Sequence, residues 1–290
     1  GAGGEVNGNY CVFNPLVKTG GQTGLLKNGN LDFEAAINSN FTNALGTIPV
    51  SSGKWYVEYT IGSNVGSSNG LGFINTESLS DAGGSYGIGQ ASDGWLRTTS
   101  LVYNNSNSVV SSLTSISSGD VVMLALDLDD GKAWWGLNGT WDASGSPATG
   151  ASEMVSFTTG EKSFVIGVSA YHSSVRASGS INFGQRAFEY TAPSGFQALC
   201  TSNISDPTIT DGSDYFDALL YTGNAGSQTI SGYEFAPSFL WLKSRGNANN
   251  HWLSDEVRGD GEVLISNATS SEQDYTSYLT GFTSDGFTLA

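Results

Sequence analysis

The stretch GDVVMLALDLDDGKAWWGLNGTW, residues 119–141, decides the fold of this chain. Asp130-Gly131 favours a two-residue hairpin turn, and apolar residues alternate on both sides of it. This turn places Asp129 opposite Lys132, and Leu126 opposite Trp135. Because side chains alternate between the two faces of a strand, one face of the hairpin is apolar. Its members are Leu124, Leu126, Leu128, Ala133, Trp135 and Leu137.

The opposite face of the hairpin carries Asp127, Asp129, Lys132 and Trp134. Trp134 therefore points away from the predicted core. Two interpretations stay open for its ring: it packs beneath a loop, or it forms part of an interface. Trp135 and Trp55 fall on predicted core faces and are expected to be packing residues.

The hairpin resembles the central hairpin of SPRY domains, in which an Asp-Leu-Asp run, a Gly turn, an aromatic pair and an Asn-Gly turn follow one another. Other segments resemble the family's strands in the same order: SSGKWYVEYTI (51–61), LGFINTESLS and SYGIG (71–89), FVIGVSAY (164–171) and INFGQRAF (181–188). The resemblance covers most of residues 1–200 and implies an antiparallel β-sandwich. It implies no particular ligand, because one fold supports many unrelated binding sites.

The composition also favours short strands joined by tight turns. Charged residues make up 13% of the 290 residues, and 39 residues are glycine. The formal charge of −16 disfavours nucleic acid as a partner, since binding to phosphates requires the opposite sign. The same sign disfavours anionic lipid surfaces, and no apolar run approaches the ~20 residues of a membrane span.

Cys11 and Cys200 are the only cysteines, one at each end of the sandwich-like region. A bridge between them is geometrically conceivable, because the termini of a sandwich often lie close together. We favour two buried free thiols. Neither end of the chain looks like a natural terminus, so the sequence is expected to be part of a longer protein.

We expect domain 1 at residues 1–200, a linker at 201–211 and a second β-rich domain at 212–290. The linker carries Pro207 and lacks an apolar pattern. Strands are expected in the second domain at 215–221, 228–235, 238–244, 262–266 and 286–290. The second domain resembles a module that follows SPRY domains in tail and structural proteins of marine bacteriophages, in residues 220–224, 235–245, 255–259 and 285–287. Its length indicates an incomplete sandwich-like domain.

Catalytic patterns are few. His172 follows a predicted strand, where an exposed or hydrogen-bonded imidazole is more common than a catalytic one. Asp127 and Asp129 share a strand face at a distance that glycoside hydrolysis permits, but they flank a turn rather than a cleft. We therefore expect a solvated edge that faces Lys132. The acids at 127, 129 and 130 lack the spacing of a calcium loop. We expect no catalytic residue, metal or other cofactor.

Aromatic side chains near turns are better candidates for contact with a ligand. Trp95, Trp141, Tyr171 and Trp252 lie near predicted turns, where an exposed ring could stack on a sugar or fill a pocket of a partner. The predicted ligand-binding residues are Trp95, Arg97, Trp134, Trp141, Tyr171 and His172. For each aromatic residue near a turn, the alternative is a ring that anchors its loop.

The predicted function is that of a non-enzymatic bacteriophage virion protein, a tail fibre or receptor-binding component on the virion surface, outside the cell. Its loops would bind a host surface glycan or another virion protein. The resemblance also implies a homo-oligomer, often a trimer in tail fibres. Three alternatives stay open: a capsid decoration or head-fibre protein, an extracellular adhesin of a cell, and a glycan-cleaving enzyme.

Overall fold

The computed structural model describes residues 8–17, 25–37, 40–62, 69–79, 86–171, 176–206 and 209–290. The chain divides into two units, residues 1–205 and 206–290. The division falls inside the segment expected to be a linker. Residues 201–203 nevertheless belong to the first unit, since they form a short 3-10 helix and the Thr201 amide donates to the carbonyl of Asn9 at 3.0 Å.

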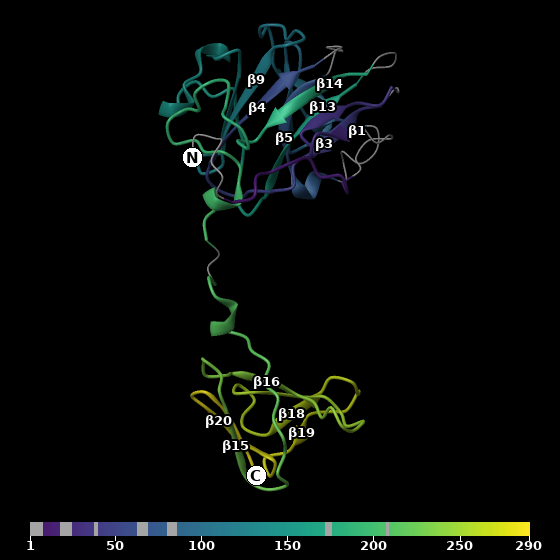
Figure 1. The fold of residues 1–290 in the computed structure, drawn as a ribbon, viewed down its shortest axis with the longest axis vertical. Coiled ribbons are helices and arrows are strands. Elements are labelled where there is room, and N and C mark those ends of the chain that lie inside the picture. The colour runs from purple at the N-terminus through teal and green to yellow at the C-terminus, as the bar shows by residue number, and fades with distance from the viewer. Residues whose placement is uncertain are drawn as a thin grey trace. The chain divides into compact units, whose positions relative to one another are not determined.

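The first unit contains two antiparallel sheets (Figure 1). The first sheet has the order β1 (Leu25–Lys27), β2 (Asp32–Glu34), β14 (Ser178–Asn182), β4 (Lys54–Ile61), β9 (Val121–Asp127), β10 (Lys132–Leu137) and β11 (Thr140–Trp141), and β12 (Val155–Ser156) also pairs with β10. The second sheet has the order β3 (Thr42–Leu45), β13 (Phe164–Ala170), β5 (Gly70–Asn75), β6 (Gly94–Arg97), β7 (Val102–Asn104) and β8 (Asn107–Val110). These strands confirm the predicted antiparallel sandwich.

The main core lies between the two sheets and is rich in aromatic rings. Phe73 on β5 stacks on Trp95 and on Trp135, with ring centroids 5.2 and 5.9 Å apart. The apolar face predicted for the 119–141 hairpin contributes all six of its members to this core, and Trp55 joins them. Burial of such rings is a main source of stability, about 1.5–3 kcal/mol for each large apolar side chain.

The register predicted for that hairpin is wrong by two residues. Lys132 pairs with Asp127 and Trp135 pairs with Leu124, so the turn contains four residues, 128–131. The cause is the side chain of Asp127, whose Oδ1 accepts the amides of Asp129 and Asp130 at 3.1 Å each. A shift of two residues keeps every side chain on its predicted face.

The outer faces of both sheets are covered as well. A chain segment with Phe188, Tyr190 and Phe196 covers the first sheet over Tyr56, Met123 and Trp134. The second sheet is covered by the segments around two short 3-10 helices, η1 (Thr76–Leu79) and η3 (Ile88–Gln90). Both sheets are therefore covered on both sides. Strands covered in this way need not alternate between polar and apolar residues, so the sequence pattern does not reveal the second covering layer.

The two cysteines are free and buried, as expected. The backbone amide of Cys11 donates a hydrogen bond to the carbonyl of Leu199 at 2.9 Å, and the neighbouring Tyr10 pairs with Cys200 in an isolated antiparallel β-bridge of backbone hydrogen bonds. The ends of the sandwich therefore do lie side by side. Burial raises the pKa of the Cys11 thiol to about 11.

The second unit has two small antiparallel sheets. One has the order β15 (Gln228–Ser231), β21 (Gly286–Leu289), β20 (Leu279–Thr283), and the other has β16 (Phe239–Leu242), β17 (Trp252–Asp255), β18 (Glu262–Ile265), β19 (Gln273–Asp274). Four of the five expected strands are found, each within its predicted range or one residue of it. The strand expected at 215–221 is absent: this described segment has no strand, and Phe216 is 78% exposed. Across the described residues, no helix has the length and apolarity that a membrane span requires.

Candidate functional site

The predicted contact residues on β6 lie inside the sandwich. Trp95 is 8% exposed and packs in the main core, and Arg97 is fully buried. The prediction that these two side chains meet a ligand is therefore wrong. Because side chains alternate between the two faces of a strand, Leu96 on β6 and Thr98 directly after it lie toward the outer face of the sheet.

Arg97 instead holds three loops together. Its Nε lies 3.0 Å from Oδ2 of Asp142, and its terminal nitrogens donate to the carbonyls of Thr98 at 2.6 Å and Thr114 at 2.8 Å. Asp142 follows β11 of the first sheet, so this ion pair joins the two sheets at one end of the sandwich. The guanidinium of Arg97 is therefore engaged in contacts within the fold.

Trp134 is also buried, beneath the segment that covers the first sheet. Its Nε1 donates to the carbonyl of Ala151 at 2.9 Å, and its ring meets that of Phe196 at 6.2 Å. The first of the two interpretations, packing beneath a loop, is correct, and contact with a ligand is excluded. Trp141 is half-buried and packs edge-on against Tyr56, at 6.3 Å.

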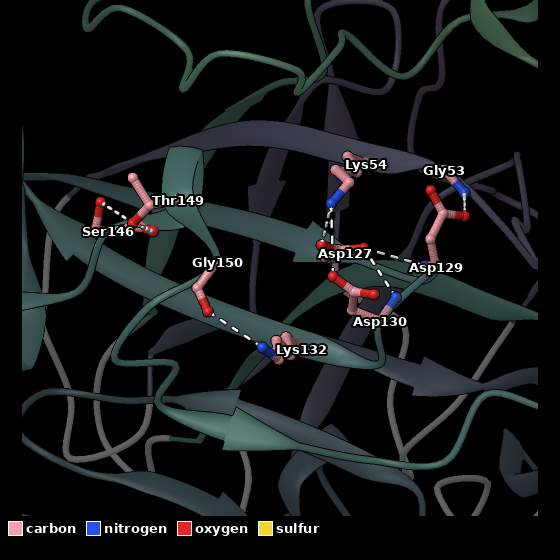
Figure 2. A network of polar contacts seen from close by, with 9 residues as sticks. All are labelled: Gly53, Lys54, Asp127, Asp129, Asp130, Lys132, Ser146, Thr149 and Gly150. Carbon is pink, nitrogen blue, oxygen red and sulfur yellow. Dashed lines mark hydrogen bonds and ion pairs between the residues drawn. The ribbon is translucent and has the colours of Figure 1, made fainter.

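The acids of the central hairpin form a structural network, shown in Figure 2. Lys54 on β4 lies with its Nζ 2.6 Å from Asp127 and 3.8 Å from Asp130, while Asp129 accepts the Gly53 amide at 2.7 Å. Asp127 is fully buried and faces Lys54 rather than Lys132, whose Nζ donates to the Gly150 carbonyl. The expected solvated edge is therefore wrong at Asp127, which closes the turn. Within the described ranges, no three His, Cys, Asp or Glu side chains group closely enough to hold a metal.

A pocket of about 210 Å³ lies on the outer face of the second sheet. Leu96 of β6 and Tyr103 of β7 come from the sheet, Thr98 directly follows β6, and Phe41 precedes β3. The full lining is Phe41, Gly87, Gly89, Gln90, Leu96, Thr98, Tyr103 and Ser106. We call this hollow the aromatic pocket. It is our candidate functional site.

One wall of the aromatic pocket is fixed by a chain of hydrogen bonds across two strands. The Ile88 amide donates to Oγ of Ser169 at 2.9 Å, and that hydroxyl donates to Oδ1 of Asn43. The Asn43 amide nitrogen donates in turn to the Tyr86 carbonyl at 2.9 Å. These contacts hold residues 86–90 against β3 and β13, so the wall is in place before any ligand arrives.

Glycine is required where this wall approaches the rings. A Cβ on Gly87 would lie 2.6 Å from Cδ1 of Phe41, and one on Gly89 would lie 2.8 Å from Cβ of Tyr103. Neither glycine has a positive φ, so the requirement is space rather than backbone freedom. The two glycines therefore shape the pocket.

Tyr171 is the predicted residue that reaches this region. Its ring lies 5.5 Å from that of Phe41, and both rings are half-buried. His172 lies outside the described residues. The structure thus brings one predicted residue next to the pocket and leaves Trp141 apart from it.

The eight lining residues limit what the aromatic pocket accepts. They offer hydroxyl and amide groups among apolar surface, without a carboxylate, imidazole or amine. The volume is below the 300–1,000 Å³ of pockets for drug-sized ligands, so it suits one neutral side chain or ring. A second hollow, of about 340 Å³, lies over β1, β2, β14 and β4, but its Lys27 and Glu34 pair with each other at 2.7 Å.

Comparisons with known proteins give one family match and several similar solved structures. Residues 211–290 match the family described as "Domain of unknown function (DUF7483)". Solved SPRY domains are similar in structure to part of this chain. The SPRY domain of human HERC1 has 18% identity and a TM-score of 0.46, over 59% of this chain and 96% of that domain. The TRIM65 PSpry domain has 14% identity and a TM-score of 0.42, over 60% and 93%. No curated protein matches the sequence.

Proposed function

We propose that this protein is a non-enzymatic binding and structural protein whose first unit holds a neutral side chain of a partner protein in the aromatic pocket. The observation that carries this proposal is the pocket itself, an uncharged hollow whose wall is hydrogen-bonded into β3 and β13. A site that is fixed in advance loses less conformational freedom when it binds, and its affinity benefits.

A partner protein suits the chemistry of the lining better than a reaction does. Catalysis requires convergent titratable groups or a metal beside the substrate. The side chains that line the pocket are apolar or carry hydroxyl and amide groups, and no carboxylate, imidazole or amine stands among them. The acids Asp127 and Asp142 are engaged elsewhere by Lys54 and Arg97.

We place the protein on the surface of a bacteriophage particle, as a tail-fibre or receptor-binding component. The support for this setting is the resemblance of residues 212–290 to modules of marine phage tail proteins. In this setting the partner is another virion protein or a host surface molecule, and the chain forms homo-oligomers. Mass spectrometry and immunogold labelling of purified particles test the setting. Label on the tail supports it, label on the capsid favours a decoration protein, and absence from particles overturns it.

The pocket is tested by selecting binders from a library of random peptides displayed on a surface. We expect a consensus with one large neutral residue, and at least a tenfold weaker affinity of that peptide for Tyr103→Ala and Phe41→Ala. Val109→Ala is the matched control, because Val109 is 48% exposed on the neighbouring strand and lies outside the pocket lining. The absence of any consensus, or equal affinity for all variants, would reject the pocket as the binding site.

The remaining alternative, a glycan-cleaving enzyme, has its own test. Incubation with host polysaccharides, followed by an assay for reducing ends, should give no product. Release of oligosaccharides above the buffer control would overturn the non-enzymatic proposal.

A further inference from the structure

The second unit exposes an aromatic strip on the outer side of the four-stranded sheet β16–β19. Phe239 and Trp241 lie two residues apart on β16 and are 53% and 62% exposed. Trp241 pairs with Leu253 of β17, which pairs with Leu264 of β18, so these three side chains form a row on one face. We call Phe239, Trp241, Leu253 and Leu264 the β16 strip.

The β16 strip faces away from the core of its unit. The alternate residue Leu240 is 4% exposed and packs with Ile230, Leu279 and Phe287. Val263, on the same inner face, is fully buried. The inner face therefore supplies the packing, and nothing in the fold of this unit requires the exposed rings outside. Contiguous exposed apolar side chains of this kind mark sites of interaction.

The indole of Trp241 is held in a fixed orientation. Its Nε1 donates to Nδ1 of His251 at 2.9 Å, and the His251 amide donates to Oδ1 of Asn267 at 2.9 Å. The indole N–H is therefore occupied, and what Trp241 offers to a ligand is the flat face of its ring.

Polar groups flank Leu253 along its own chain segment. His251 precedes Leu253 by two residues. Asp255, which pairs with Phe239 across the strands, follows Leu253 by two residues and forms an ion pair with Arg258. An apolar floor flanked by hydrogen-bonding groups matches a pyranose ring, whose axial C–H bonds form an apolar face and whose hydroxyls lie around the edge. The electron-rich face of an indole attracts such slightly positive C–H groups.

From this geometry we propose that the β16 strip binds a neutral oligosaccharide by stacking sugar rings on Trp241 and Phe239. The charge selects a neutral sugar: residues 206–290 contain 12 Asp and Glu and 3 Lys and Arg, a formal charge of −9, which repels phosphate, sulfate and uronate groups. The size argues against a protein partner, since four side chains are few beside the 20–30 residues per side of a standard protein interface.

The test uses the full chain and an array of neutral glycans, with cellohexaose, chitohexaose, maltohexaose and mannohexaose titrated in solution by tryptophan fluorescence. We expect saturable binding of at least one neutral glycan, and at least a tenfold weaker affinity for Trp241→Ala. Tyr278→Ala is the matched control, because Tyr278 is 56% exposed in the same unit but packs with Trp252 rather than on the strip. Its affinity should stay within twofold of the wild type.

Several outcomes would overturn the sugar assignment: no neutral glycan binds, anionic oligosaccharides bind more tightly, or Trp241→Ala binds as well as the wild type. Concentration-dependent self-association that Trp241→Ala abolishes, without sugar binding, would assign the strip to a second copy of the chain. The site is separate from the aromatic pocket. Tyr103→Ala should therefore leave sugar binding unchanged, and either proposal can fail without the other.

Discussion

Arg97 and Asp142 form an ion pair inside the sandwich, with Nε 3.0 Å from Oδ2 and side chains 0% and 7% exposed. The pair links the end of β6 in one sheet to the residue that follows β11 in the other. The carbonyls that Arg97 also holds belong to two further loops. One buried cation thus fixes the loops at this end of the sandwich.

We predict that Arg97→Met destabilises the first unit by about 3–5 kcal/mol, since the Asp142 carboxylate would stay buried without its partner. Urea unfolding followed by fluorescence measures the loss. Arg186→Met is the control: Arg186 is exposed, and its replacement should change the free energy of unfolding by less than about 0.5 kcal/mol. A loss below about 1 kcal/mol for Arg97→Met would contradict the structural role.

We predict opposite results for two tryptophans. Trp134 is fully buried and donates to the Ala151 carbonyl, so Trp134→Ala should cost about 3–5 kcal/mol. Trp241 is 62% exposed, and Trp241→Ala should cost less than about 1 kcal/mol. Thermal unfolding of both variants makes the comparison. Similar losses for the two would show that the burial described for them is wrong.

Glu58 should control the segment that covers the first sheet. This buried carboxylate accepts the amides of Glu189 and Tyr190 at 2.8 Å each and the Tyr56 hydroxyl at 3.0 Å. Glu58→Gln replaces one acceptor by a donor, which leaves a backbone amide unsatisfied at about 1–3 kcal/mol. We expect faster proteolysis between residues 185 and 197. A cleavage rate equal to that of the wild type would refute this anchoring.

The ion pair of Lys54 and Asp127 should show in the alkaline range of pH. The hydrogen bond that Lys54 donates to the Asp127 carboxylate raises the pKa of Lys54 above its usual 10.5, against the opposing effect of burial. A raised folded-state pKa means that the stabilisation is complete below pH 10.5 and is lost as the pH rises through the folded value. In Asp127→Asn the pKa of Lys54 should fall back, as NMR titration of its side chain would show. An unchanged pKa would contradict the pairing.

Gly87→Ala should narrow the aromatic pocket. Its new methyl group would lie 2.6 Å from Cδ1 of Phe41, so the ring must shift, at a cost of about 1–3 kcal/mol. We expect weaker binding of a selected peptide and a lower melting temperature. Gly223→Ala is the control, because a Cβ there meets no atom within 4 Å. Equal behaviour of the two variants would show that Gly87 does not shape the site.

The hairpin at 119–141 shows how far alternation alone reaches. The apolar face predicted from it is the face that enters the core, because a register shift of two residues leaves every side chain on the same face of the strand. The register itself depended on the Asp127 side chain, whose bonds to two amides make a four-residue turn. The turn propensity of Asp130-Gly131 does not distinguish this four-residue turn from the predicted two-residue turn.

The predicted contact residues failed for a related reason. Trp95 and Arg97 lie on the strand that follows the predicted Asp93-Gly94 turn, where contact with a ligand is expected. Both sheets are covered on both sides, however, so the polarity of a residue does not indicate which face of the strand meets solvent. The sequence does not mark the residues that line the aromatic pocket. Tyr103, Leu96 and Phe41 have no local pattern that distinguishes them from other aromatic and apolar residues of the chain. The Gly87-Ile88-Gly89 run was a usable hint, because glycines beside apolar residues often mark a close approach of chain segments.

The sequence by itself determined the all-β class and the face of the central hairpin that enters the core. It also placed a domain boundary within residues 201–211, and it favoured free, buried cysteines over a bridge. These properties follow from local alternation, turn residues and composition. Only the tertiary structure decided where the aromatic pocket and the β16 strip lie. The pocket is built from segments that lie between residues 41 and 106, and the strip depends on the register of three neighbouring strands. Which rings remain exposed depends on what else packs over a sheet, and that is a property of the whole fold.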